Sequence, residues 1–147
     1  LPHLQIKRVL RGKGIGNINN IVNSYMAFEL KYNLSFSAYD FDTRGLDLNI
    51  DLAKGGEEFV HIGGSKTTLK PNDFIFYDDN GVVYSFAEGY RDSSKVTSST
   101  KNVLFTIDAP GGIGRIVLDQ AAQELVASYP SSRSVFLDYQ SNKQSLI

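Results

Sequence analysis

The sequence predicts an α+β domain in which helices flank an antiparallel, barrel-like sheet. The expected elements run helix, helix, five to seven short strands and helix, which is not the alternating order of a parallel α/β sheet. Residues 46–52 alternate between apolar and polar side chains, as a half-buried strand does. Asp79, Asn80 and Gly81 stand between two apolar runs and are a strong hairpin signal.

Two helices are expected before the sheet and one after it. Residues 4–10 are a short helix candidate that the run Arg11–Gly14 ends. Residues 18–32 space their apolar side chains by three and four, which predicts an amphipathic helix ending at Asn33. The candidate caps of this helix are Asn17, Asn19 and Asn20. Residues 116–126 have helical spacing too.

Short apolar segments supply the strands. They are residues 34–41, 46–52, 59–62, 74–77, 82–86 and 103–107, with 135–137 as a candidate last strand. Residues 65–71 are expected to be a polar loop, and residues 140–147 a weakly ordered tail. The 74–86 hairpin presents a polar, glycine-containing loop, residues 87–100, which is a usual way for a scaffold to carry a site.

Composition narrows the class of protein. The 147 residues suit a single domain, 1–147, with a real core, although the chain does not begin with Met, which leaves an upstream segment open. The net charge of -1 gives no general support for nucleic-acid binding but leaves a local patch open. The chain has no cysteine, its two histidines have no second ligand at metal-binding spacing, and no apolar run has membrane length, so we expect no metal, cofactor or membrane partner. Nothing in the sequence suggests secretion, and we expect a cytoplasmic protein.

Several polar groups are candidates for chemistry, each with a plainer alternative. His61 is a catalytic candidate or a face residue of the sheet. The adjacent carboxylates of Asp78 and Asp79 are better explained by turn chemistry. The Gly12–Gly14 run resembles a phosphate loop without its Lys-Ser/Thr ending. Residues 90–95 gather Arg, Asp, Ser and Lys, which suits anion binding or acyl chemistry, or a solvated loop.

Motifs in a fixed order resemble a known family. Gly14–Asn23 and LSFSAYDFD (34–42) are similar to a region of the tRNA-editing domain of the phenylalanyl-tRNA synthetase β subunit. Stand-alone relatives of that domain are matched more closely. The matching segments are RGKG (11–14), Gly45-Leu46-Asp47, GGEEFVHIGG (55–64) and YRDSSKVTSSTKNV (90–103). The similarity covers about residues 9–129, and it is the order and spacing of the motifs that make it specific.

The resemblance implies a compact α+β fold with a pocket between its two halves. In the synthetase this pocket hydrolyses tyrosine wrongly attached to the phenylalanine tRNA. For this chain it implies a tRNA partner, bound by its aminoacylated 3′ end, with the oligomeric state left open. Catalytic roles fall on Ser37 and Asp92, which would orient the water or the ammonium group. Substrate-binding roles fall on Asn20, Tyr25, Asp40, Gly89, Arg91, Lys95 and Thr106.

Departures from the family pattern qualify these roles. The family's pocket Thr-Asn pair falls at Tyr25-Met26, its pocket His at Ser37 and its tyrosine-recognising Glu at Thr106. Loss of that Glu removes the acceptor for a tyrosine hydroxyl, so tyrosine specificity is not expected. Arg91 would hold the terminal phosphate and Lys95 the RNA backbone.

Some roles and functions stay open on the sequence alone. Asn20 is also a helix-cap candidate, and Asp40 fits a pocket or a turn. The function expected is hydrolysis of mischarged aminoacyl-tRNA in trans. The alternatives are a non-catalytic module that binds RNA or an amino-acid-like ligand, and a fragment whose site is completed by an upstream segment.

Overall fold

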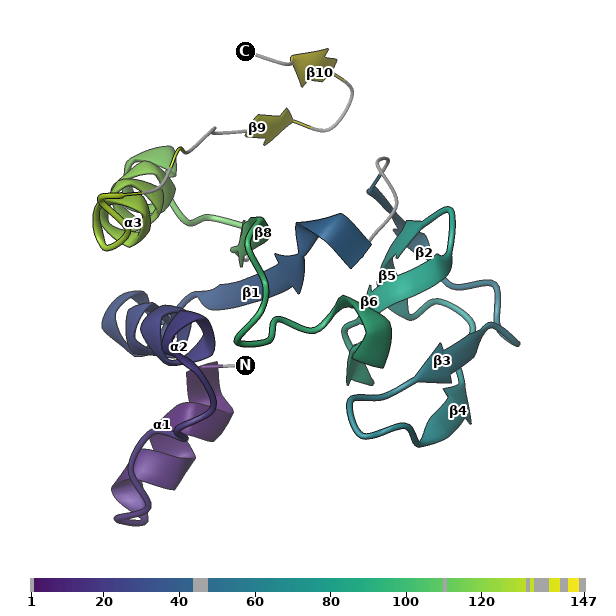
Figure 1. The fold of residues 1–147 in the computed structure, drawn as a ribbon. Coiled ribbons are helices and arrows are strands. Elements are labelled where there is room, and N and C mark those ends of the chain that lie inside the picture. The colour runs from purple at the N-terminus through teal and green to yellow at the C-terminus, as the bar shows by residue number, and fades with distance from the viewer. Residues whose placement is uncertain are drawn as a thin grey trace. The chain divides into compact units, whose positions relative to one another are not determined.

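The computed structural model describes residues 2–43, 48–109, 111–131, 133, 138–140 and 143–145. The chain divides into two compact units, Leu1–Asp108 and Ala109–Ile147, which we describe separately (Figure 1). The first unit holds α1, α2 and the strands β1 to β8. The second unit holds α3, β9 (Asp138–Gln140) and β10 (Lys143–Ser145), the last two paired antiparallel. No helix among the described residues is long and apolar enough to cross a membrane.

The three predicted helices are confirmed. They are α1 (Pro2–Leu10), α2 (Asn20–Tyr32) and α3 (Arg115–Ala127). The cap of α2 is Asn19, whose side chain accepts a hydrogen bond of 2.9 Å from the backbone N–H of Val22. Asn20 is therefore the first helical residue and not the cap. Asn33 ends α2 in the left-handed conformation, at φ 52°.

The strands of the first unit are short. They are β1 (Ser35–Asp40), β2 (Asn49–Leu52), β3 (Glu58–Val60), β4 (Lys66–Thr68), β5 (Phe74–Asp78), β6 (Gly81–Ser85), β7 (Gly89–Tyr90) and β8 (Val103–Asp108). They form three antiparallel sheets of order β1-β8, β2-β5-β6-β7 and β3-β4. The α+β class is confirmed, but the described strands do not close into a barrel. The expected barrel-like sheet is in this respect wrong.

The predicted hairpin is the centre of the four-stranded sheet. β5 and β6 pair through the turn at Asp79 and Asn80, with a register shift between Phe76 and Tyr77. Strand β8, which follows β7 in the chain, does not join this sheet and pairs with β1 along its whole length. Strands separated by more than 60 residues thereby lie side by side, which periodicity alone does not reveal.

Two loop predictions need correction. Residues 65–71 are not wholly a loop, because β4 pairs there with β3. Residues 87–100 are not a solvated loop either, since they contain β7 and the short 3-10 helix η2 (Asp92–Ser94) and bury Arg91, Ser94 and Val96. A second 3-10 helix, η1 (Phe41–Thr43), follows β1. Residues 44–47, including the Gly-Leu-Asp motif, and the candidate strand 135–137 lie outside the described residues.

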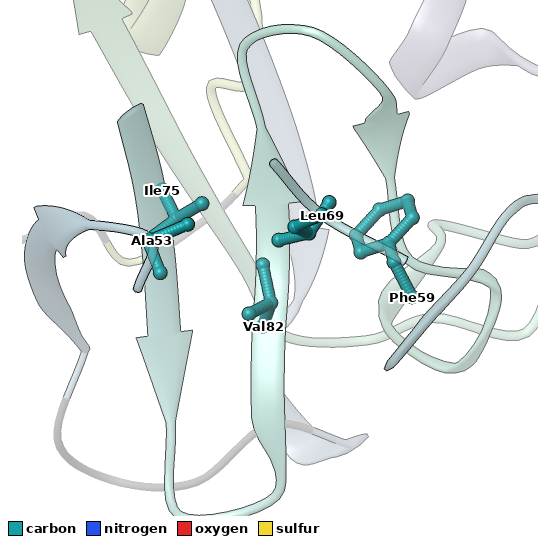
Figure 2. Close-up of a cluster of buried hydrophobic side chains, with 5 residues drawn as sticks. All are labelled: Ala53, Phe59, Leu69, Ile75 and Val82. Carbon is teal, nitrogen blue, oxygen red and sulfur yellow. The ribbon is translucent and has the colours of Figure 1, made fainter. Parts of the chain in front are cut away.

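Among the residues that the structure describes, two apolar clusters link the sheets of the first unit. One contains Ala53, Phe59, Leu69, Ile75 and Val82 and joins the β3-β4 hairpin to the β5-β6 hairpin (Figure 2). The other contains Tyr39, Phe76, Val83 and Tyr84, with Tyr90 and Leu104 packed against it. This second cluster packs the β1-β8 sheet onto the four-stranded sheet. On the other side, α2 contacts β1, where the rings of Phe28 and Phe36 lie 6.1 Å apart.

Candidate functional site

One face of the β1-β8 sheet gathers polar side chains. Ser37 is directly opposite Thr106, and Ser35 is opposite Asp108. Residues paired across antiparallel strands point to the same face, as do residues two apart on one strand. Ser37, Thr106 and Asp108 therefore share a face. Within the described residues, Oγ1 of Thr106 and Oδ2 of Asp108 are buried without a hydrogen-bond partner.

Tyr90 of β7 meets this face. Its hydroxyl lies 3.0 Å from Oγ of the fully buried Ser37 and donates a longer bond of 3.4 Å to the carbonyl of Phe36. The Tyr90 ring packs against Tyr39 and Tyr84, at centroid distances of 5.9 and 5.1 Å. Tyr90 therefore connects the four-stranded sheet to β1 through both its ring and its hydroxyl.

Helix α2 adds two titratable groups. The Tyr25 side chain interacts with that of Tyr90, and Glu29 accepts a bond of 3.1 Å from the backbone N–H of Phe36. Burial, followed by the negative charge of Glu29, raises the pKa of Tyr25 to about 12, although the interaction with Tyr90 opposes the rise. Burial also raises the pKa of Glu29. We call the whole group the tyrosine cluster: Tyr25, Glu29, Ser37, Tyr39, Tyr84, Tyr90, Thr106 and Asp108.

The tyrosine cluster is a low-dielectric, electronegative environment. Burial raises the pKa of Asp108 to about 6, and it raises the pKa values of Tyr39, Tyr84 and Tyr90 further above their ordinary range. The charge of Asp108 contributes to each of these tyrosine shifts. None of the eight members carries a positive charge. The cluster thus offers hydroxyl groups that can orient water and a carboxylate that can accept an ammonium group.

Arg91 lies in a different environment from Tyr90. Its guanidinium donates two hydrogen bonds to Asp78, of 3.2 and 2.9 Å, and the residue is only 8% exposed. Asp78 also accepts a bond of 2.7 Å from the backbone N–H of Asn80. The turn interpretation of Asp78 is therefore confirmed, and the ion pair is an addition that the sequence did not reveal. Arg91 is committed to the hairpin and offers little surface to a phosphate.

Asp92 and Lys95 brace the loop around η2. The Asp92 carboxylate accepts bonds of 2.6 Å from Nζ of Lys95 and 3.0 Å from the backbone N–H of Gly63. Both bonds lower the pKa of Asp92, and the bond from Lys95 has the larger effect. Neither group contacts Ser37. Nε2 of His61 lies 3.4 Å from a carboxylate oxygen of Glu88, and the His61 backbone forms a β-bridge with Arg91, which fits the face-residue alternative.

The remaining predicted site residues are Asn20, Asp40 and Gly89. Asn20 is exposed at the start of α2. Asp40 fits the turn alternative, since it accepts bonds of 3.1 Å from the backbone N–H of Asp42 and 2.6 Å from the hydroxyl of Thr100. Gly89, at φ 91°, returns the chain from β6 into β7 and so positions Tyr90.

Of the nine predicted site residues, the structure brings together Tyr25, Ser37 and Thr106. Tyr90, Asp108 and Glu29 were missed. Asp108 could have been found, because it lies two residues beyond Thr106 on the same strand and hence on the same face. Tyr90 begins the candidate segment 90–95 but was given no role there, and no sequence signal points to Glu29, whose place depends on how α2 packs.

A separate groove of about 350 Å³ lies beside the first apolar cluster. Its lining includes Leu52, Lys54, Glu57 and Tyr77, and none of the predicted site residues. The lining also includes the charged Asp51, and no member of the tyrosine cluster.

Comparison with known proteins identifies the family of this chain and a solved structure with a similar fold. The B3/4 domain family matches residues 3–122, and the chain belongs to this family. The described fold is also similar to that of an N-terminal fragment of the phenylalanyl-tRNA synthetase β subunit from Pyrococcus horikoshii. The TM-score is 0.62 and the identity 17%, over 75% of this chain and 39% of that one.

Two curated relatives are similar over about two thirds of the chain. The phenylalanine–tRNA ligase β subunit of Fusobacterium nucleatum is 26% identical over 102 residues, and that of Corynebacterium jeikeium is 29% identical over 102 residues. Each alignment covers 69% of this chain but only 13% and 12% of the respective relative. The chain therefore spans about an eighth of the length of these relatives. The resemblance to the synthetase β subunit is confirmed.

Proposed function

We propose that this protein binds the aminoacylated 3′ end of tRNA and hydrolyses mischarged aminoacyl esters in trans. The setting we propose is the cytoplasm, where aminoacyl-tRNA is used. Support comes from membership of the B3/4 family and from relatives named as phenylalanine–tRNA ligase β subunits. The observation that carries the proposal is the tyrosine cluster, which joins Tyr25, Ser37 and Thr106 from distant parts of the chain around unpartnered polar atoms.

The chemistry is the addition of water to an ester. The water oxygen attacks the aminoacyl carbonyl carbon, the bond from that carbon to the ribose oxygen breaks, and the ribose oxygen takes a proton. The products are free amino acid and uncharged tRNA. In our proposal the hydroxyls of Ser37 and Tyr90 orient the water, since their 3.0 Å contact fixes both oxygens.

The substrate ammonium needs a carboxylate, and we assign that role to Asp108 in place of Asp92. Asp108 has a buried oxygen without a partner and shares a face with Ser37, whereas Asp92 is held by Lys95 and Gly63. Thr106, with an unpartnered hydroxyl, would contact the amino-acid side chain. Arg91, Asp92 and Lys95 would act by holding the loop that positions Tyr90.

A non-catalytic binding module is the second candidate. It is favoured by the buried state of Ser37, which is fully enclosed in the described fold, and by the lack of a histidine in the tyrosine cluster. Such a module would hold the same aminoacyl group without activating water.

The test is a deacylation panel. Total tRNA is mischarged separately with several non-cognate amino acids, and release of each amino acid is followed at low protein concentration. Tyr90→Phe keeps the ring contacts and removes the hydroxyl, so we expect it to lower turnover by about a hundredfold, within the range for loss of one positioned proton-transfer group. Tyr77→Phe is the matched control, because Tyr77 packs against the other apolar cluster.

The outcomes separate the candidates. The result we expect is turnover of one or two species, which Tyr90→Phe lowers by about a hundredfold and Tyr77→Phe leaves unchanged. Binding of aminoacyl-tRNA without turnover would establish the binding module. A folded protein with neither binding nor turnover would overturn both.

A further inference from the structure

Positive charge is concentrated at the start of the chain. Four of the fifteen basic residues, Lys7, Arg8, Arg11 and Lys13, fall within seven positions. The first acidic residue is Glu29, and it is buried. The other eleven basic residues share the rest of the chain with all sixteen acidic ones. A protein with net charge -1 therefore has one strongly basic end.

These side chains are exposed and belong to ordered backbone. All four lie in the exposed class, and no described carboxylate forms an ion pair with them. The turn after α1 is closed by hydrogen bonds to the helix end, from Gly12 N–H to the carbonyl of Val9 and from Lys13 N–H to that of Arg8. Nε of Arg8 also donates to the carbonyl of Gly14 at 3.0 Å. The charges are thus presented by a helix end and not by a loose tail.

We propose that this basic surface, formed by Lys7, Arg8, Arg11 and Lys13, binds the phosphate backbone of tRNA. The inference rests on the proposed function, for which it supplies the missing contact to the nucleic acid. Phosphate contacts from Lys and Arg dominate the affinity of proteins for nucleic acids and carry no sequence information. Gly12 and Gly14 have open space where a side chain would be, so a phosphate can also approach the backbone closely.

The position of the surface suits a ligand that continues into the tyrosine cluster. α1 packs against α2, and the basic turn leads directly to the Asn19 cap. Tyr25 follows the first residue of α2 by five positions, a rise of about 7.5 Å along the helix. RNA held on the basic turn would thus have its end within reach of α2 and the residues that α2 contributes to the cluster.

A basic helix with apolar residues could also bind an anionic membrane, but the structure favours RNA. Interfacial helices bury a continuous apolar face in the lipid. In α1 the residues Ile6, Val9 and Leu10 share one side and are 37%, 42% and 81% exposed, but the helix has only nine residues and packs against α2. The four exposed cations of α1 and the turn after it therefore favour an anionic polymer over a lipid surface.

The test measures binding of uncharged tRNA at several salt concentrations. The double variant Lys7→Gln, Arg11→Gln removes two charges while keeping good helix-forming side chains. The control double variant is Lys54→Gln, Lys70→Gln, at two exposed lysines on strand connections. We expect the first to weaken binding about tenfold or more at 50 mM salt and to reduce the slope of log K against log salt by about 1.5, while the control changes neither.

A second measurement uses the unaltered protein. Acetylation of surface lysines is compared with and without tRNA, and we expect tRNA to protect Lys7 and Lys13 but not Lys54 and Lys70. Equal protection at all four, or equal loss of affinity in both double variants, would overturn the proposal. So would binding to vesicles of anionic lipid in the absence of tRNA binding. Because uncharged tRNA is used, these results do not depend on whether the tyrosine cluster hydrolyses esters.

Discussion

The buried ion pair between Arg91 and Asp78 allows a stability prediction worked from the structure. Asp78→Asn leaves the guanidinium, with a side chain 10% exposed, beside a neutral amide. Removing one partner of a buried pair destabilises a protein by about 3–5 kcal/mol. With an m-value near 2 kcal/mol/M, the urea midpoint should fall by about 2 M. The assay is equilibrium unfolding in urea followed by far-UV circular dichroism.

The control is an exposed pair in the same unit. Oε1 of Glu58 lies 3.0 Å from Nζ of Lys66, and the two side chains are 66% and 64% exposed. Glu58→Gln should therefore lower the free energy of unfolding by less than about 1 kcal/mol. The double variant Asp78→Leu, Arg91→Met should recover most of the stability, because it leaves no buried charge. If Asp78→Asn shifts the midpoint no more than Glu58→Gln, the structural role assigned to Arg91 is refuted.

Three further predictions concern other sites. Because burial raises the pKa of Asp108 from 3.8 to about 6, stability should fall by up to about 3 kcal/mol as pH rises from about 4 to 6, and Asp108→Asn should flatten that profile in thermal melts. Asn19→Ala should cost about 1 kcal/mol of urea stability by removing the cap of α2, and an unchanged midpoint would contradict the cap assignment. Gly55→Ala should lower the melting temperature more than Gly56→Ala: both have positive φ, but only at Gly55 would the added carbon meet Pro71, at 2.7 Å.

The helices and the β5-β6 hairpin could be predicted because each is specified by residues that are close together in the sequence. The spacing of three and four in residues 18–32, and the Asp-Asn-Gly turn, each depend on neighbours within a few residues. Residues 46–52 show what such local signals do not determine, namely the exposure of a strand. Their alternation predicted a half-buried strand, yet all four residues of β2 are exposed, since exposure depends on what packs against the sheet.

The candidate site could be predicted only in part, because its residues come from segments that are far apart in the sequence. Ser37 and Thr106 were expected in a pocket through family resemblance, and their direct pairing across β1 and β8 is long-range. The loop at residues 90–95 is a different case, because the sequence left ligand binding and a solvated loop open. Its charges suggested a ligand, but Arg91 and Asp92 satisfy partners elsewhere in the chain, Asp78 and Gly63, that sequence does not bring near. Tyr90, at the start of that loop, lies instead with Ser37, and Asp108 shares the face of Ser37 and Thr106.

The most direct measurement is the location of a bound aminoacyl group. A non-hydrolysable 3′-aminoacylamino-adenosine would be titrated into isotope-labelled protein while backbone amide shifts are followed by NMR. Our account predicts the largest changes at Ser37, Tyr90, Thr106 and Asp108, and their loss when the ligand ammonium is acetylated. Changes centred on Gly63, Asp92 and Lys95 instead, or no saturable change at all, would contradict the claim that the tyrosine cluster is the site.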